Sequence, residues 1–304
     1  MTGSLEAGAE RFSGFADLYD GVRPLPPTDL GDLLSSYLGG TPSLVVDLGS
    51  GTGLSTRWAS TWAKEVIGIE PSDDMRTTAG ATEAPGPGKV SYRAGWSHET
   101  GLPTAAADAI IVVQALHWME PRSTLAEIER CLRPGGVFAA IDCDWPPIVG
   151  DWTTEAAWDA CRRRMRVFET RLADGAGGSE IAAAVETDDA EAARYSGSDA
   201  HDQRLLSSGV RSWSKSEHLQ RMVDSGHFSF CRDIAMASAD FGTAERLIGL
   251  LRSQGDYQTL RRHGIADHEL GVDRFAEIAN SRLGSTRQPW RFVYRVRLGF
   301  KAEV

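Results

Sequence analysis

The sequence predicts an α/β protein: a doubly wound, seven-stranded, mostly parallel sheet with an antiparallel last strand and a helical insertion that serves as a lid. Three observations predict this fold. Between residues 41 and 144, apolar runs of strand length alternate with helical stretches, the order typical of a parallel sheet with helical crossovers. A glycine-rich turn follows the first of these runs. The last run, WRFVYRVRLGFK, alternates apolar and polar residues as a strand does.

The first 40 residues are expected to form a helical cover segment. Within it RPLPP ends one helix, and TDLGDLLSSYL begins another with Thr28 as its cap. The core then follows over residues 41–144. Its expected strands, in chain order, are LVVDLG, EVIGIE, VSYRAG, ADAIIVVQAL and VFAAIDCD. Its expected helices are LSTRWASTWA, PSDDMRTTAGA and PRSTLAEIERCL.

Two further segments follow the core. Residues 145–226 are expected to form the helical substrate lid, and the acidic stretch 174–203 inside it has no assigned role. Residues 227–304 are expected to complete the core sheet. They hold the strand FSFCRDIAMASADFG, one helix or two in TAERLIGLLRSQGDYQTLRRHG, and a last helix in ADHELGVDRFAEIANSRLG.

Composition and charge narrow the classes of function. A net charge of -10 argues against broad attraction to nucleic acid or to an anionic membrane surface. No apolar run reaches the ~18 to 20 residues that a membrane span needs. The first residues, MTGSLEAGAERFSG, lack the basic start and the apolar core of a secretion signal. We therefore expect a cytoplasmic protein, monomeric or homodimeric, whose partner is a small molecule.

The stretch VVDLGSGTG raises the question of which ligand its turn holds. A strand, a tight turn and a helix start together form a site for a polar ligand. The nicotinamide and flavin fingerprint, G-x-G-x-x-G, holds a pyrophosphate, but here Gly53 comes one position early and Asp47 precedes the turn. A carboxylate repels a pyrophosphate and attracts a cation. S-adenosylmethionine carries an ammonium and a sulfonium and has no phosphate, so it suits this turn.

A set of motifs in order resembles the class I S-adenosylmethionine-dependent methyltransferases. These motifs are VVDLGSGTG, VIGIEPSDDM, RAGWSHETGLP, DAIIVVQALHWM and LRPGGVFAAID. The N-terminal FADLYDGVRPLPP, with ERLIGLLRSQGDYQTL and WRFVYRVRLGFK, is similar to the type 11 subfamily that includes trans-aconitate methyltransferases. The resemblance implies a Rossmann-like fold, S-adenosyl-L-methionine as cofactor and S-adenosyl-L-homocysteine as product.

The resemblance also implies roles for particular residues. Glu70, at the end of the second strand, would bind the ribose hydroxyls, and Tyr19 with Arg23 would close over the methionine part of the cofactor. At the adenine loop Gly95 is followed by Trp96 and not by the acid or small polar residue usual in the family. The full set of expected cofactor-binding residues is Tyr19, Arg23, Asp47, Gly49, Ser50, Gly51, Gly53, Glu70, Pro71, Met75, Gly95, Trp96, Ser97 and Gln114.

His117 is the candidate for chemistry, because it follows the fourth strand, where the sulfonium methyl would lie. A histidine there could take a proton from the acceptor; the alternative is that it packs under the helical cover. Asp142 and Asp144 could in principle hold Mg²⁺, but we interpret them as strand-end residues and expect no metal. Arg162 to Arg166 are interpreted as a solvated helix face, with a patch for an acidic substrate as the alternative.

We therefore expect methyl transfer to an oxygen, nitrogen or carbon atom of a small-molecule metabolite, as in secondary metabolism. The tryptophans expected to line an apolar acceptor pocket are Trp118, Trp145, Trp152 and Trp213. Two alternatives stay open: a non-methylating S-adenosylmethionine-binding protein and a nucleotide-dependent oxidoreductase. The identity of the acceptor and the atom that is methylated do not follow from the sequence.

Overall fold

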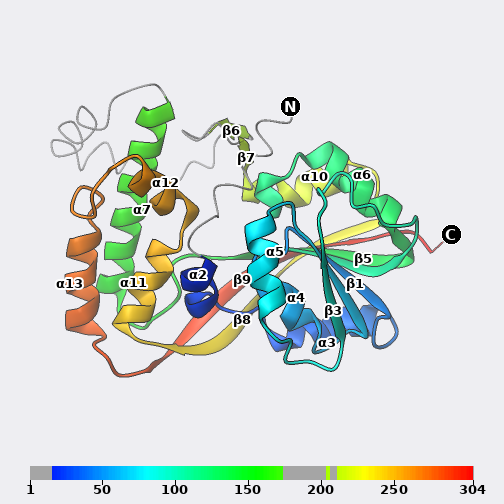
Figure 1. Ribbon diagram of the computed structural model, residues 1–304, viewed down its shortest axis with the longest axis horizontal. Helices are drawn as coiled ribbons and strands as arrows, with labels where there is room; N and C mark the ends of the chain where they lie inside the picture. Colours follow the sequence, from blue (N-terminus) through cyan, green and yellow to red (C-terminus); the bar gives the residue numbers. More distant parts are fainter. Residues whose placement is uncertain (1–15, 174–202, 206–210, 304) are drawn as a thin grey trace. The chain divides into compact units, whose positions relative to one another are not determined.

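The computed structural model describes residues 16–173, 203–205 and 211–303 (Figure 1). The chain divides into two compact units, which are described separately. The sheet unit comprises Pro24–Asp144, Trp213–Ser238 and Val293–Val304. The helical unit comprises Met1–Arg23, Trp145–Ser212 and Ala239–Phe292.

The sheet unit holds the following elements, in chain order: α3 (Thr28–Tyr37), β1 (Leu44–Leu48), α4 (Leu54–Ala59), β2 (Glu65–Ile69), α5 (Asp73–Ala81), β3 (Lys89–Arg93), β4 (Ala107–Val113), the 3-10 helix η1 (Leu116–Trp118), α6 (Pro121–Cys131), β5 (Leu132–Cys143), the 3-10 helix η2 (Lys215–Glu217) and α10 (His218–Asp224). The helical unit holds α2 (Ala16–Val22), α7 (Trp152–Ala173), β6 (Gln203–Leu205), α11 (Ala244–Arg252), α12 (Gly255–Arg262) and α13 (Val272–Arg282). The division between the units falls within β7 (Arg211–Trp213), β8 (Phe230–Gly242) and β9 (Gln288–Phe300).

The main sheet has seven strands in the order β3-β2-β1-β4-β5-β9-β8. β1 pairs in parallel with β2 and β4, β2 with β3, and β4 with β5, whereas β9 is antiparallel to β5. The strand order reverses between β1 and β4, which in such sheets is the point where ligands bind beyond the carboxyl ends of the strands. The predicted fold class is confirmed. β6 and β7 form a separate two-stranded sheet.

The core of the sheet unit consists of apolar strands with helices on both sides (Figure 1). Val45, Val46 and Leu48 of β1 are fully buried, as is the run Ala109–Ile111 of β4. α4 contacts β1 and β2, α5 contacts β3, and α6 contacts β5. Burial on both faces explains why these strands are nearly continuous apolar runs and not alternating ones.

The helical unit packs around aromatic side chains. α13 contacts α7 and α11, and α11 contacts α2. The rings of Trp158 and Phe275 meet edge to face, with centroids 5.9 Å apart. Gly242 lies so close to the ring of Trp290 that a Cβ atom there would approach it to 2.2 Å. The amphipathic helices of this unit therefore bury their apolar faces against one another.

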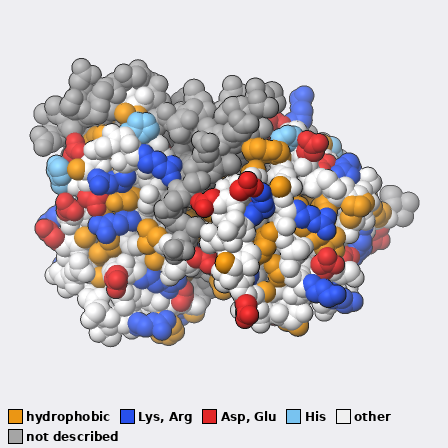
Figure 2. Space-filling view, in the orientation of Figure 1, with side chains coloured by type: hydrophobic (Ala, Val, Ile, Leu, Met, Phe, Trp, Pro, Cys, Tyr) orange, Lys and Arg blue, Asp and Glu red, His pale blue; other side chains and the backbone are white. Residues whose placement is uncertain are grey.

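Acidic and basic side chains are interspersed over the face of the molecule in Figure 2. In the helical unit some of them form ion pairs, such as Arg246 with Asp240 at 2.7 Å and Arg252 with Asp267 at 3.0 Å. Partly exposed pairs of this kind contribute only about 0–1 kcal/mol each. The buried apolar surface therefore accounts for most of the stability of each unit.

Three local expectations can be compared with the structure. Thr28 does not cap α3: it is the first residue of the helix, and Pro27 occupies the cap position without a side-chain hydrogen bond. The stretch after β8 forms two helices, α11 and α12. The acidic stretch 174–203 lies, apart from residue 203, outside the described residues. Within the described ranges, the helices are too short or too polar for any of them to cross a membrane.

Candidate active site

The glycine turn after β1 adopts a backbone that only glycine takes without strain. Gly49, Gly51 and Gly53 have φ angles of 70°, 54° and 82°. The N–H groups of Gly49 and Ser50 both donate to the carbonyl of Ile69, at 2.8 and 3.2 Å. A Cβ atom at Gly49 would meet Met119 and Ala115, whereas one at Gly51 would meet nothing within 4 Å. The turn is therefore fixed to the end of β2 and open at Gly51.

Asp47 is a fully buried carboxylate at the base of this turn. Its Oδ2 accepts hydrogen bonds from the hydroxyls of Ser55 and Thr56, both at 2.7 Å. Its Oδ1 has no hydrogen-bond partner among the described residues. Burial raises the pKa of Asp47 to about 7, helped by the charge of Glu70 and opposed by the two hydroxyls. Burying an oxygen without a hydrogen-bond donor costs free energy, because the oxygen has lost its contacts with water. A cation at Oδ1 would offset that cost.

Glu70 connects the glycine turn to the end of β2. Its Oε2 accepts from the N–H of Gly51 and its Oε1 from the N–H of Ser72, both at 3.0 Å. Burial raises the pKa of Glu70, although these hydrogen bonds and Arg76 act in the opposite direction. The neighbouring Pro71 is half-buried and Met75 is buried on α5. Each carboxylate oxygen keeps a lone pair that a ribose hydroxyl can use.

The loop after β3 contains the expected adenine residues. A Cβ atom on Gly95 would come within 2.9 Å of Ile69, so the loop backbone lies directly against β2. Trp96 is half-buried, and its ring stacks on that of His98 with centroids 6.4 Å apart. The hydroxyl of Ser97 bonds to that of Thr124 at 2.9 Å. The structure therefore brings this loop to the same end of the sheet as Glu70.

Gln114 ends β4 with a positive φ of 57°, a conformation that costs free energy in a residue with a side chain. Its N–H donates to the carbonyl of Ile141 at 2.8 Å, and its side-chain amide donates to that of Cys143 at 3.3 Å. The amide oxygen accepts from the ammonium of Lys215 at 2.7 Å. The strained backbone thus places one amide between β5 and η2.

Asp142 lies at the end of β5 and is almost completely buried. Lys215 Nζ is 3.0 Å from Oδ1, and Arg297 Nη1 donates to Oδ2 at 2.9 Å. Burial alone would raise the pKa of Asp142, but the cations Lys215 and Arg297 hold it below its ordinary value. The carboxylate is therefore ionised and paired with two cations.

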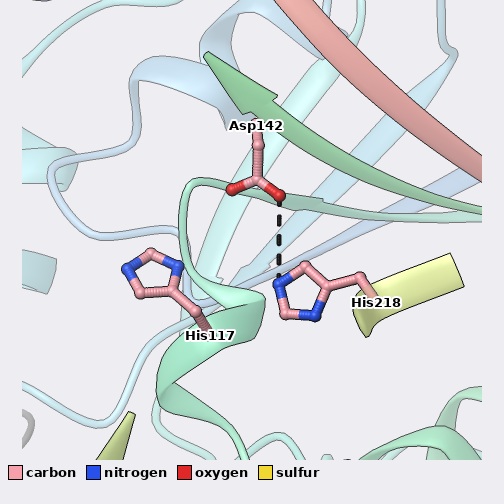
Figure 3. Close-up of side chains that lie close together, drawn as sticks. All are labelled: His117, Asp142 and His218. Carbon is pink, nitrogen blue, oxygen red and sulfur yellow. Dashed lines mark ion pairs between the residues drawn. The ribbon is translucent and has the colours of Figure 1, made fainter. Parts of the chain in front are cut away.

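His117 and His218 lie beside Asp142 (Figure 3). One ligand-type atom from each of the three side chains lies within 4.8 Å of the others. His218 Nε2 is 3.9 Å from Asp142 Oδ2. Burial, reinforced by Arg221 and other nearby cations, lowers the pKa of His218 to about 4 despite the attraction of Asp142. His218 is therefore neutral at neutral pH.

Other expected residues have contacts of their own within each unit. Tyr19 and Arg23 belong to the helical unit, where the guanidinium lies 4.5 Å from the ring centre of Tyr19 and its Nη2 donates to the carbonyl of Ser253 at 2.8 Å. Asp144 does not join the cluster: it pairs with Arg295 at 3.3 Å, and both are about half exposed.

The remaining candidates are also divided between the units. Arg162 pairs with Asp256, and this contact lies within the helical unit. Of the tryptophans, Trp152 is 79% exposed and Trp145 stacks on Trp158, both in the helical unit. Trp118 and Trp213 belong to the sheet unit and are half-buried.

No sequence pattern indicates that Lys215, His218 or Arg297 are site residues. Each is far along the chain from β4 and β5, and no short motif contains them. The only available signal was the scarcity of lysine: the whole sequence has four, Lys64, Lys89, Lys215 and Lys301. That signal does not indicate where Lys215 lies in the fold.

Proteins named as methyltransferases are similar to this chain, which agrees with the sheet order and with the glycine turn. Residues 46–140 match the family model described as a methyltransferase domain. An uncharacterized methyltransferase of Mycobacterium tuberculosis is 32% identical over 136 residues, which is 45% of this chain and 53% of that protein. A probable S-adenosylmethionine-dependent methyltransferase of Saccharomyces cerevisiae is 31% identical over 124 residues, 40% of this chain and 43% of that protein. The chain thus spans about half the length of the curated relatives it matches.

A solved structure extends the comparison to most of the chain. A protein of Anaeromyxobacter dehalogenans, provisionally named a type II methyltransferase, has a TM-score of 0.58 and 20% identity, over 93% of this chain and 98% of its own. At this identity the likeness concerns the fold. The sheet order and the glycine turn agree with the methyltransferase fold of that structure. The family model that residues 46–140 match is the type 11 methyltransferase domain.

Proposed function

We propose that this chain binds S-adenosylmethionine at the glycine turn and methylates a small-molecule acceptor. The observation that carries the proposal is the buried Oδ1 of Asp47, which has no hydrogen-bond partner among the described residues. An ammonium group satisfies such an oxygen with a charge-assisted hydrogen bond. A pyrophosphate at the same place would meet an ionised carboxylate, which disfavours a nucleotide-dependent oxidoreductase.

The residues of the sheet unit have complementary tasks in this proposal. Asp47 holds the amino group of the cofactor, Glu70 accepts from the ribose hydroxyls, and Gly51 allows close approach of the ligand to the backbone. When bound, S-adenosylmethionine supplies a methyl group already activated on a sulfonium. Orienting the acceptor and excluding water account for much of the rate enhancement that the protein must provide.

His117 is assigned the role of proton acceptor for the acceptor group. It lies on η1 just after β4, at the carboxyl edge of the sheet, and it is half-buried. The neutral form of an imidazole can accept a proton, so a histidine suits this task. Tyr19 and Arg23 are assigned to the methionine part of the cofactor by family resemblance, and Arg23→Ala is expected to weaken cofactor binding in calorimetry.

The experiment that tests the function has two parts. Isothermal titration should show binding of S-adenosylmethionine and S-adenosylhomocysteine and none of a nicotinamide dinucleotide. Asp47→Ala or Glu70→Ala should abolish that binding, whereas Asp74→Ala, on the exposed part of α5, should not. Near-normal affinity in the Asp47 and Glu70 variants would refute the assigned site.

The second part identifies the acceptor. The protein is incubated with isotopically labelled S-adenosylmethionine and a metabolite extract, and mass spectrometry locates the product that gains the labelled methyl group. Tight cofactor binding without any labelled product would instead support the non-methylating alternative.

A further inference from the structure

The cluster beside Asp142 resembles a metal site in its geometry, but its charges oppose a metal. His117, Asp142 and His218 place one donor atom each within 4.8 Å of one another. A divalent cation bound there would face the ammonium of Lys215, 3.0 Å from Asp142 Oδ1, and the guanidinium of Arg297, 2.9 Å from Oδ2. Both oxygens of the single carboxylate already pair with a cation. A further double positive charge would be strongly repelled in this buried place.

The tautomer of His218 also opposes a metal. Arg221 Nη1 lies 3.3 Å from His218 Nδ1, and a guanidinium can only donate, so Nδ1 must accept. In a neutral ring the proton is then on Nε2. A protonated nitrogen cannot ligate a metal, but it can donate a hydrogen bond.

His218 Nε2 is a buried polar atom without a hydrogen-bond partner within the described part of the chain, and Asp142 Oδ1 beside it has its ion pair with Lys215 at 3.0 Å. His218 is 2% exposed and Asp142 is 4% exposed. The ring nitrogen faces the carboxylate in Figure 3, but its 3.9 Å distance from Oδ2 is too long for a hydrogen bond. The cluster therefore presents one unused donor, His218 Nε2, beside a carboxylate whose Oδ1 pairs with Lys215 and keeps a further lone pair for a second donor.

A hydroxyl group matches this pair, because it accepts one hydrogen bond and donates another. An amine that is to be methylated uses its only lone pair in the reaction and cannot accept a hydrogen bond at the same time. The reacting carbon of a carbon acid has neither a lone pair for His218 nor an O–H or N–H for Asp142. The cluster is also not sealed, since His117 is half-buried and the Lys215 side chain is 33% exposed. Lys215 is held by Asp142 and by Gln114, and its charge would stabilise an oxygen that loses its proton.

We infer that the His218–Asp142 pair is the binding subsite for the hydroxyl group of the acceptor, and that the acceptor is an alcohol or a phenol. This inference rests on the proposed function for its reaction. On binding, His218 Nε2 donates to the hydroxyl oxygen and the hydroxyl donates to Asp142. For the reaction the hydroxyl turns its one hydrogen from Asp142 to His117, which takes the proton as the oxygen–carbon bond forms. The carbon–sulfur bond of the methyl donor breaks at the same time and leaves its electron pair on sulfur.

The first experiment measures binding, independently of methyl transfer. Full-length protein with ¹⁵N-labelled histidine is titrated with phenol and with anisole, in which the donor hydrogen is absent. Phenol should shift the ring resonances of His218 and His117, with at least tenfold higher affinity than anisole. Equal affinity for the two probes, or no shift of the His218 ring, would overturn the inference, as would Zn²⁺ binding that the His218→Phe variant loses.

Matched variants distinguish a hydroxyl subsite from a structural contact. His218→Phe keeps the ring and removes the donor, so the preference for phenol should disappear. His218→Gln retains an N–H at a similar place and should restore at least part of that preference. Exposed His268, in the helical unit, provides the control His268→Ala, which should behave as the unaltered protein. A preference for phenol that survives in His218→Phe would mean that this pair holds an ordered water only.

The second experiment identifies the methylated atom. The labelled product from the metabolite extract should show the ¹³C chemical shift of a methoxy group, and a methyl group on nitrogen or carbon would refute the inference. Failure of the proposed function is a separate observation: no cofactor binding in calorimetry. The phenol titration remains informative in that case, because it needs no cofactor.

Discussion

The buried carboxylate of Asp47 should make the stability of the ligand-free protein depend on pH. Burial raises its pKa from 3.8 to about 7, and each pKa unit corresponds to about 1.4 kcal/mol. Keeping Asp47 ionised in the ligand-free fold therefore costs about 4 kcal/mol. The perturbation that reveals this cost is Asp47→Asn, which removes the titrating group and preserves its shape.

The sign follows from comparing the folded and unfolded states. The folded protein holds the Asp47 proton more tightly, because its pKa is higher there. Protonated Asp47 contributes its full stabilisation of the folded state below about pH 4. This stabilisation falls as the pH rises from about 4 to 7 and is lost above about 7. Between about pH 5 and pH 8 the unaltered protein should lose about 3 kcal/mol relative to Asp47→Asn.

The assay is urea unfolding at several pH values for both proteins, since carboxyl groups that do not interact with Asp47 contribute equally and cancel in the difference. In Asp74→Asn, altered at an exposed position, the free energy of unfolding should change with pH as it does in the unaltered protein. Affinity for S-adenosylmethionine should rise over the same pH range, because the ammonium group pairs with the ionised form. Parallel unfolding curves for Asp47→Asn and the unaltered protein would refute the reasoning.

Three other variants test separate parts of the structure. His117→Ala should lower turnover while calorimetric affinity for S-adenosylhomocysteine changes less than about twofold; unchanged turnover would support a packing role. Arg297→Met leaves Asp142 buried with one cation fewer and should cost about 2–4 kcal/mol in urea unfolding, and a loss below about 1 kcal/mol would contradict the importance of this pair. Gly242→Ala would push a Cβ atom against Trp290, so thermal unfolding should shift by the equivalent of about 1–3 kcal/mol; an unchanged melting temperature would show that the ring moves aside freely.

The part of the site proposed to bind the cofactor follows from local sequence patterns. A buried apolar strand, glycines at fixed spacing and an acid before them are all properties of one short stretch, VVDLGSGTG. The structure gives its three glycines positive φ angles and buries Asp47 completely. Glu70 is likewise set by its place at the end of a strand. Such features are predictable because adjacent residues determine them.

The cluster around Asp142 depends on pairing between distant segments, which no local pattern encodes. The alternation in WRFVYRVRLGFK suggests that its arginines face solvent, and Arg295 is indeed exposed. Arg297 is buried instead, because Asp142 on the neighbouring strand provides a charge partner. Lys215 and His218 reach the same carboxylate from η2 and the start of α10. The residues next to Gln114 in the sequence do not predict its positive φ either.

The glycine turn and the Asp142 cluster draw on different parts of the polypeptide. Asp47, Glu70 and Gln114 fall inside the segment 46–140 that matches the family model, whereas Asp142, Lys215, His218 and Arg297 all fall outside it. On the two proposals made above, changes at these four positions alter the acceptor subsite and leave intact the turn proposed to bind the methyl donor. Proteins that share the matched segment would then diverge in acceptor choice by altering a strand end, one short helix and the last strand, without rebuilding the proposed cofactor site.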